Sequence, residues 1–240
     1  NITGDWNTAI GFHTLYNNIN GDFNVSIGNV SLLGNTSGQA NTAVGNATLR
    51  YNKTGNLNTA LGLGALEGNK AGNYAVAIGA NAMQYADSTS TTFDNTNIAI
   101  GYQALRGSEN PASNTGDENT VIGYQTLMVN TSGQDNTAIG TEVLFKNTTG
   151  DNNTAIGRRS LYENIIGDWN TAIGVQSMYS NESGGSNVAI GANSLYYNLT
   201  GALNTATGYH ALEDNESGGS NTGNGAMALS GNISGNNNTA

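Results

Sequence analysis

The sequence predicts an all-β fold, a parallel β-solenoid or β-roll of 17-residue coils with two short strands in each coil. Composition, a strict internal period and the residue types at fixed positions support this prediction. The 240 residues include 40 Asn and 34 Gly, two residue types that disfavour regular helices. Such a skewed composition indicates either disorder or repetition, and a hydrophobic share of 37% favours repetition.

The period is 17 residues. The segment NITGDWNTAIGFHTLYN is followed at once by NINGDFNVSIGNVSLLG, and similar segments continue almost to the last residue. With Asn1 as position one, repeats begin at Asn1, Asn18, Asn35, Asn52, Asn69, Asn130, Asn147, Asn164, Asn181, Asn198, Asn215 and Asn232. The gap between Asn69 and Asn130 equals three periods plus ten residues. We therefore expect a single solenoid over 1–240, about fourteen repeats, with short insertions inside 86–94 and 108–112.

Fixed positions within the repeat indicate local structure. Position eleven is Gly in all thirteen repeats that reach it, which indicates positive φ or a close chain approach. Position four is Gly after Asn-x-Thr/Ser in most repeats, which is typical of a turn. Position eight is Thr, Val or Ile, position ten is mostly Ile, Val or Leu, and position fifteen is Leu or Met. These β-branched and apolar residues predict strands over positions seven to ten and thirteen to sixteen.

Stacked coils are expected to bury side chains that a single coil cannot cover. Ile10 and Leu15 would form continuous inner rows. Asn stands at position seven in thirteen of fourteen repeats, Ala75 being the exception, and predicts a ladder of side-chain hydrogen bonds. Position nine is small, as at Ala9, and alternates with Ile10. An outward stripe of small residues would then favour a homo-oligomer.

Charge and composition exclude several classes of partner. The net charge is −10 and only 10% of residues are charged, which disfavours nucleic acid and anionic membranes because both bind basic patches. The absence of Cys excludes disulfides and Cys-ligated metals. No run of 18 apolar residues occurs, so we expect no membrane insertion within this segment. The missing start Met and signal peptide, with a partial last repeat, suggest a mature form or a fragment of a longer fibre.

The recurring word NTAIG carries a resemblance to a known family. In 7–15, 136–144, 153–161 and 170–178 it is followed by a small residue and then Leu or Met. This pattern resembles the YadA-like head repeats of trimeric autotransporter adhesins, and it is similar to repeats in viral tail fibres. The resemblance covers essentially the whole chain. It implies a left-handed parallel β-roll that forms a trimer along a common axis and is displayed on a cell or virion surface. The present repeat is longer and adds the Asn-x-Thr/Ser-Gly turn.

Asn-x-Thr/Ser sequons give the first set of candidate sites. They recur at position one, on an expected surface turn where glycosylation would be possible. The same residues are also favoured in turns without any modification. The candidate glycosylation sites are Asn1, Asn35, Asn52, Asn130, Asn147, Asn181, Asn198, Asn215 and Asn232.

Aromatic residues and the insertions give the second set. Tyr162, Tyr179 and Tyr196 share position sixteen in consecutive repeats. We expect them to stack and stabilise neighbouring coils, with sugar binding as the alternative. The insertions contain Phe93 and Pro111 and are expected to be loops, so these residues are candidates for a lateral contact or receptor patch.

Catalysis has little support in the sequence. His13 and His210 share one position but lie eleven repeats apart, and no Ser/His/Asp or paired-carboxylate arrangement recurs locally. One Asp per turn is too few for calcium, and the Thr column is too interrupted for ice binding. We therefore expect no enzyme, cofactor or metal.

Two functions follow from the sequence. The first is a structural extracellular fibre or adhesin-type shaft, acting by rigid display and surface attachment, that associates with itself as a homotrimer or head-to-tail filament. The alternative is a receptor-binding or glycan-binding tail fibre or adhesin head, whose partners are surface glycans or a host receptor. Both place the protein outside the cell, on a cell surface or on a virion.

Overall fold

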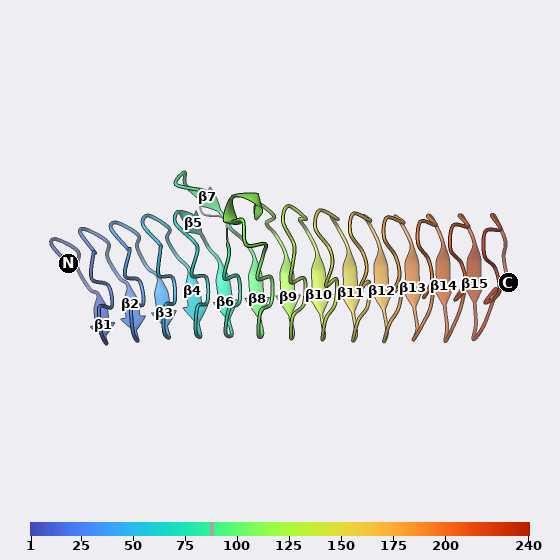
Figure 1. Ribbon diagram of the computed structural model, residues 1–240, viewed down its shortest axis with the longest axis horizontal. Coiled ribbons are helices and arrows are strands. Elements are labelled where there is room, and N and C mark those ends of the chain that lie inside the picture. Colours follow the sequence, from blue (N-terminus) through green and yellow to red (C-terminus); the bar gives the residue numbers. More distant parts are fainter. Residues whose placement is uncertain (87–88) are drawn as a thin grey trace. The chain divides into compact units, whose positions relative to one another are not determined.

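The computed structural model describes residues 1–86 and 89–240, which form two compact units, 1–122 and 123–240. Each unit is a stack of coils whose strands follow one another in chain order and pair in parallel (Figure 1). The predicted all-β parallel solenoid with 17-residue spacing is confirmed. The prediction that all 240 residues form one uninterrupted solenoid stays a prediction.

The sheet of the first unit contains seven strands of three residues. Each strand lies beside the strand of the next coil, so that Thr8 is opposite Val25 and Ile10 is opposite Ile27, 17 residues apart. The strands are β1 (Thr8–Ile10), β2 (Val25–Ile27), β3 (Thr42–Val44), β4 (Thr59–Leu61), β6 (Val76–Ile78), β8 (Ile98–Ile100) and β9 (Thr120–Ile122).

The second unit repeats the same arrangement over six strands. Thr154 lies opposite Thr171, and a parallel bridge between Thr222 and Thr239 adds the partial last coil. The strands are β10 (Thr137–Ile139), β11 (Thr154–Ile156), β12 (Thr171–Ile173), β13 (Val188–Ile190), β14 (Thr205–Thr207) and β15 (Thr222–Asn224).

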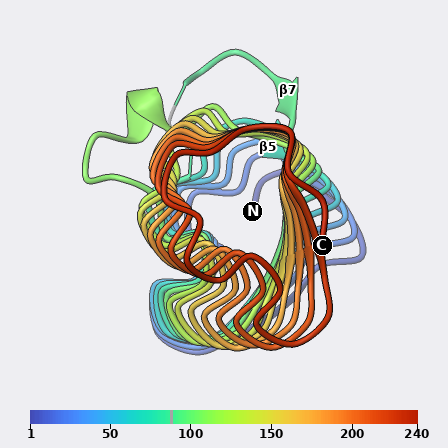
Figure 2. The same ribbon diagram turned by 90° about the vertical axis from the view of Figure 1, so that its right-hand side faces the viewer.

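Both predicted insertions are present in the first unit. Val76 pairs with Ile98, and Ile98 pairs with Thr120, so each step spans 22 residues instead of 17. The first insertion adds a small sheet of β5 (Gly72–Asn73) and β7 (Phe93–Asp94), and the second contains the 3-10 turn η1 (Pro111–Ser113). β7 and this turn project outside the stacked coils of the unit (Figure 2). Residues 87–88 of the first insertion lie outside the described residues.

The second predicted strand of each coil is wrong. Within the described residues each coil contributes one strand to the main sheet, and positions thirteen to sixteen form turns. Positions thirteen and fifteen have positive φ, as at Arg159 (56°) and Leu161 (51°), and an extended strand cannot contain such residues. The segment still bonds from coil to coil, because Leu161 N donates to Ser177 O at 3.0 Å.

The expected orientation of positions nine and ten is also wrong. Ala43 and Ala155, at position nine, are fully buried, whereas Ile10 is 60% exposed. Successive strand residues face opposite sides, so Ala and the Asn of position seven face inward and Ile faces outward. The interior between the strand and the buried Leu row has room only for small side chains. The Leu row itself is confirmed, since Leu15, Leu32 and their equivalents as far as Leu212 are buried.

The predicted Asn ladder at position seven is confirmed and fully bonded. The Oδ1 atom of Asn170 accepts from the backbone N and the Nδ2 of Asn187, each at 3.1 Å. Its Nδ2 donates to Asn153 Oδ1 at 3.1 Å and to Gly184 O at 2.8 Å. Ala75 has no amide group to continue the ladder. Asn95 takes its place, since its Oδ1 accepts from Asn97 Nδ2 at 2.8 Å.

Glycine is required at two positions for different reasons. Gly174, at position eleven, has φ of 140°, and a Cβ there would come within 2.5 Å of Gly191 O, so both demands predicted for this position are present. Gly167, at position four, has no positive φ, but a Cβ would approach Gly184 O to 2.5 Å. Position four is therefore glycine because the coils approach too closely there for a side chain.

Candidate functional site

The sequon asparagines of position one form a second internal ladder. Asn181 Nδ2 donates to Asn164 Oδ1 at 2.7 Å and to Gly184 O at 3.0 Å. Seven of the nine candidates are at most 3% exposed: Asn35, Asn52, Asn130, Asn147, Asn181, Asn198 and Asn215. A glycan joined to Nδ2 would have to pass through the core and would break the ladder, so glycosylation of these seven in the folded chain is contradicted.

The two remaining candidates lie in the terminal coils. Asn1 Nδ2 donates to Gly4 O at 2.7 Å, and Asn232 Nδ2 donates to Asn215 Oδ1 at 2.8 Å. Asn1 joins the ladder through its Oδ1, which accepts from Asn18 Nδ2 at 2.9 Å, whereas Asn232 joins it through its Nδ2. Both terminal coils are more open to solvent. Turn geometry accounts for the recurring Asn-x-Thr/Ser pattern at position one.

The aromatic column of position sixteen is a stacked ladder, as predicted. Phe145, Tyr162, Tyr179 and Tyr196 have ring centroids 5.1–5.2 Å apart and planes within 6° of parallel. Burial raises the pKa of the Tyr162 and Tyr196 hydroxyls above their ordinary value. Because Tyr162 and Tyr179 have a neighbouring ring on both faces, neither has a free ring face to hold a sugar. Its role is to join neighbouring coils.

The two candidates in the insertions have different surroundings. Phe93 lies over Gly72, where an added Cβ would come 2.7 Å from its Cζ, so its ring anchors β7 on the coil. Pro111 opens the turn η1. The second insertion is held by Asn114, whose Oδ1 accepts from Ser108 N at 3.0 Å. Their role as a lateral or receptor contact stays a prediction.

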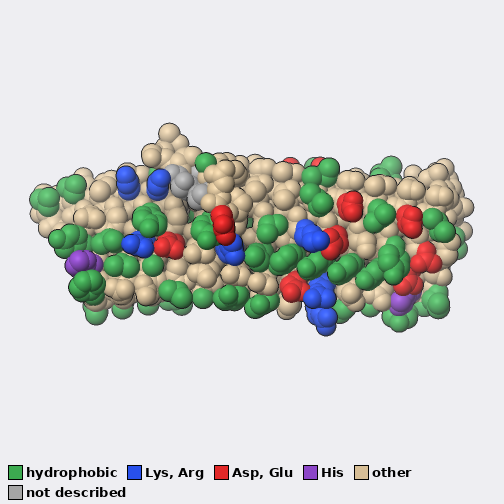
Figure 3. All heavy atoms as spheres, in the orientation of Figure 1, with side chains coloured by type: hydrophobic (Ala, Val, Ile, Leu, Met, Phe, Trp, Pro, Cys, Tyr) green, Lys and Arg blue, Asp and Glu red, His purple; other side chains and the backbone are tan. Residues whose placement is uncertain are grey.

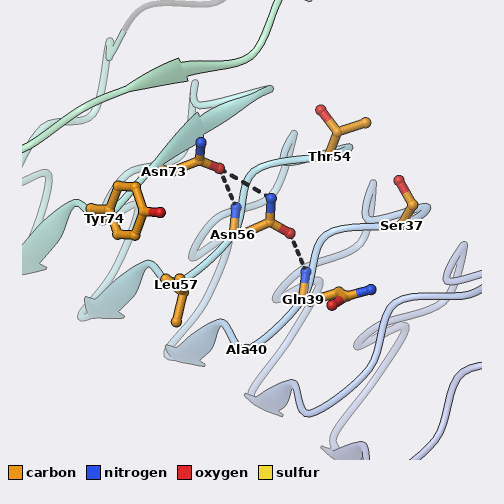
Figure 4. Close-up of a pocket in the computed structure, with 8 residues that line it drawn as sticks. All are labelled: Ser37, Gln39, Ala40, Thr54, Asn56, Leu57, Asn73 and Tyr74. Carbon is orange, nitrogen blue, oxygen red and sulfur yellow. Dashed lines mark hydrogen bonds between the residues drawn. The ribbon is translucent and has the colours of Figure 1, made fainter.

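An open groove of about 580 Å³ runs along the first unit at positions three, five and six (Figure 4). It is lined by Ser37, Gln39, Ala40, Thr54, Asn56, Leu57, Asn73 and Tyr74. Asn73 Oδ1 accepts from Asn56 N at 2.9 Å and from Asn56 Nδ2 at 3.2 Å, and Asn56 Oδ1 accepts from Gln39 N at 2.8 Å. The floor of the groove is therefore a third ladder whose amides are largely occupied.

A second groove of about 470 Å³ lies on the same unit near the second insertion. Its lining residues are Tyr51, Glu67, Gly68, Lys70, Gln84, Tyr85 and Glu109. Unlike the first groove, it combines two aromatic rings with charged side chains. Basic and acidic side chains also occur close together on the face of the molecule drawn in Figure 3.

The outer face of each sheet is free of charge and combines a row of mostly Thr at position eight with a row of mostly Ile at position ten. Ile156, Ile173 and Ile190 of the second unit are 36–41% exposed in one row. Across the strands that the structure describes, positions eight and ten carry no charged side chain in either unit. Sequence reasoning missed this row because it placed Ile inside. The recurring Asn of position seven and the small residue of position nine lie on the same face of the strand, and this pattern could have identified the inner face.

The remaining chemistry is sparse. His13 stacks on Phe12 with centroids 3.9 Å apart, and His210 Nδ1 lies 2.5 Å from the carboxylate of Glu213. The described part of the chain contains no group of three or more His, Cys, Asp or Glu side chains placed to hold a metal ion. Among the same residues, no helix has the length and apolar character needed to cross a membrane.

Comparison with protein families, curated proteins and solved structures finds no match for this chain.

Proposed function

We propose that this chain is a structural repeat protein, part of an extracellular fibre or adhesin-type shaft that acts by rigid display. The fold is compatible with this role because neighbouring coils bond through the backbone and, over parts of each unit, through three side-chain ladders. The resemblance to YadA-like head repeats points in the same direction. Stability of such a stack grows with each added coil, which suits a spacer.

Assembly of the fibre would use the outer sheet face, with a second copy of this chain as its partner. The single observation that supports this is the row of exposed Ile side chains on a surface without charge. Contiguous exposed apolar patches mark interaction sites in soluble proteins. A chain with net charge −10 repels its copies elsewhere, so two copies approach most easily through the uncharged face. Identical coil spacing would let their rows interdigitate.

The experiment is the native mass of the purified chain by sedimentation, compared between two variants. Ile173→Lys places a charge in the middle of the row, while Ile166→Lys adds the same charge at a more exposed site outside the strands. Thr207 and Asn224 already occupy position ten in the last coils, so polar residues at this position are compatible with the fold. We expect masses that are multiples of 24.7 kDa for the wild type and for Ile166→Lys. For Ile173→Lys we expect the dissociation constant of the assembly to be at least tenfold higher. Equal masses for the two variants would reject this face as the interface.

A further inference from the structure

Two tyrosines flank a glycine in one surface column of the first unit. Tyr51, Gly68 and Tyr85 occupy position seventeen of three consecutive coils. The backbone gives their order, since Tyr51 N donates to Glu67 O at 3.2 Å and Gly68 N donates to Gln84 O at 2.9 Å. The two tyrosines are therefore two coils apart, about 9.6 Å at the usual spacing of paired strands, and no side chain separates them at this position.

The stacked column at position sixteen of the second unit, one position before the column of Tyr51, shows how aromatic rings of successive coils are spaced in this fold. There, Phe145, Tyr162 and Tyr179 occupy successive coils with centroids 5.2 Å apart and nearly parallel planes. Omitting one ring from such a column leaves a slot of one ring's thickness. The groove at Gly68 has a volume of about 470 Å³, within the range of small-molecule sites.

Charges around the slot are mostly paired with one another. Arg50 lies 3.7 Å from Glu67, and Arg106 lies 3.5 Å from Glu109. The Arg106 guanidinium is 5.1 Å from the centroid of Tyr85, and Arg106 belongs to the next coil, on the side away from the slot. The Arg50 guanidinium is 5.1 Å from the centroid of Tyr51, so a ligand would share the Tyr51 ring with Arg50. These ion pairs fix the side chains beside the slot and leave little net charge there to attract a small ion.

We propose that this slot binds one pyranose ring of a glycan between Tyr51 and Tyr85. The C–H groups of a pyranose carry slight positive charge and match the negative face of an aromatic ring. Its hydroxyl groups both donate and accept hydrogen bonds, as do the rim residues Gln84, Glu67 and Lys70 taken together. An organic cation would meet Lys70 and two carboxylates, Glu67 and Glu109, that are already paired with arginines, and a purely aromatic ligand would leave the polar rim unused.

This inference goes beyond the structural role and is independent of it, because its readout is ligand binding by the purified chain and not assembly. Gly68→Tyr fills the slot with a ring. Gly34→Tyr is the matched control, because it adds the same ring at position seventeen on the other side of Tyr51. The backbone is equally tight at both sites, where a Cβ would lie 3.0 Å from Gln84 O or from Arg50 O.

The probe is a panel of oligosaccharides of neutral hexoses, N-acetylhexosamines and uronic acids, tested by saturation-transfer NMR and then by calorimetry. At least one sugar class should bind the wild type and Gly34→Tyr with affinities within twofold. Gly68→Tyr should weaken that binding at least tenfold. Tyr51→Ala should do the same, and because Tyr51 is 47% exposed this variant decides the question if Gly68→Tyr does not fold. Circular dichroism verifies the fold of each variant.

Three results would overturn the proposal. The first is the absence of binding by every sugar of the panel at millimolar concentration. The second is equal binding of a sugar by the wild type, Gly68→Tyr and Tyr51→Ala. The third is slot-dependent binding of phenol or tetramethylammonium without binding of any sugar, which would assign the site to another class of ligand.

Discussion

Removal of one ladder side chain, Asn170→Ala, tests the internal hydrogen bonding of the solenoid. Alanine keeps the backbone bond to Asn153 Oδ1 but removes the acceptor for Asn187. Gly184 O keeps its bond from Asn181 Nδ2 at 3.0 Å. Two donors of Asn187, its backbone N–H and one Nδ2–H, are then buried without a partner. At about 2 kcal/mol for each orphaned donor, the free energy of unfolding should fall by about 4 kcal/mol.

The assay is urea unfolding followed by circular dichroism, with amide hydrogen exchange at Asn187 as a local readout. The control is Asn152→Ala, a half-exposed neighbour at position six, where Ala40 occurs naturally with the same backbone conformation. The control should change stability by less than about 1 kcal/mol, as surface substitutions usually do. If Asn170→Ala is no more destabilising than the control, or Asn187 keeps its exchange protection, the ladder does not stabilise the fold.

Three further predictions follow from the packing and the pKa values. Leu161→Ala removes a fully buried side chain and should lower the free energy of unfolding by about 3 kcal/mol in the same urea assay. Ala75→Asn should not stabilise the chain, since Asn95 already occupies that place in the ladder, and a higher melting temperature would contradict this. Because burial raises the pKa of Tyr162 and Tyr196, their stabilising effect is complete below the unfolded-state value of about 10. It is lost as the pH rises through the folded-state value, and absorbance titration at 295 nm should detect the late ionisation.

The fold was predictable because its constraints recur in every coil. The period, the insertions and the ladder at Asn170 and its equivalents all follow from residues that return at fixed spacing. The second strand was not predictable from residue types, because Leu161 has positive φ, a conformation that Leu rarely adopts. The Leu161 side chain is buried in the coil when the backbone has this conformation. Propensity scales describe residue types and do not include such burial.

The candidate sites were harder to predict than the fold. Asn181 and its equivalents match a glycosylation sequon, yet the same residue types also suit an internal ladder, and only burial separates the two. Ile173 faces outward because Asn170 and Ala172 already occupy the inner side of the strand. The slot at Gly68 depends on the residues of neighbouring coils at one position, which becomes visible when the repeats are aligned by column.

The most direct test of the proposed function is to measure whether the outer sheet face contacts a second copy of the chain. The chain has no cysteine, so Thr171→Cys carries a single nitroxide label on the outer face of β12. Packed sheets lie about 10 Å apart, so the account predicts strong dipolar broadening between labels of neighbouring copies, lost on dilution with unlabelled chain. A sharp spectrum that does not change on dilution would contradict the proposal that copies assemble through this face.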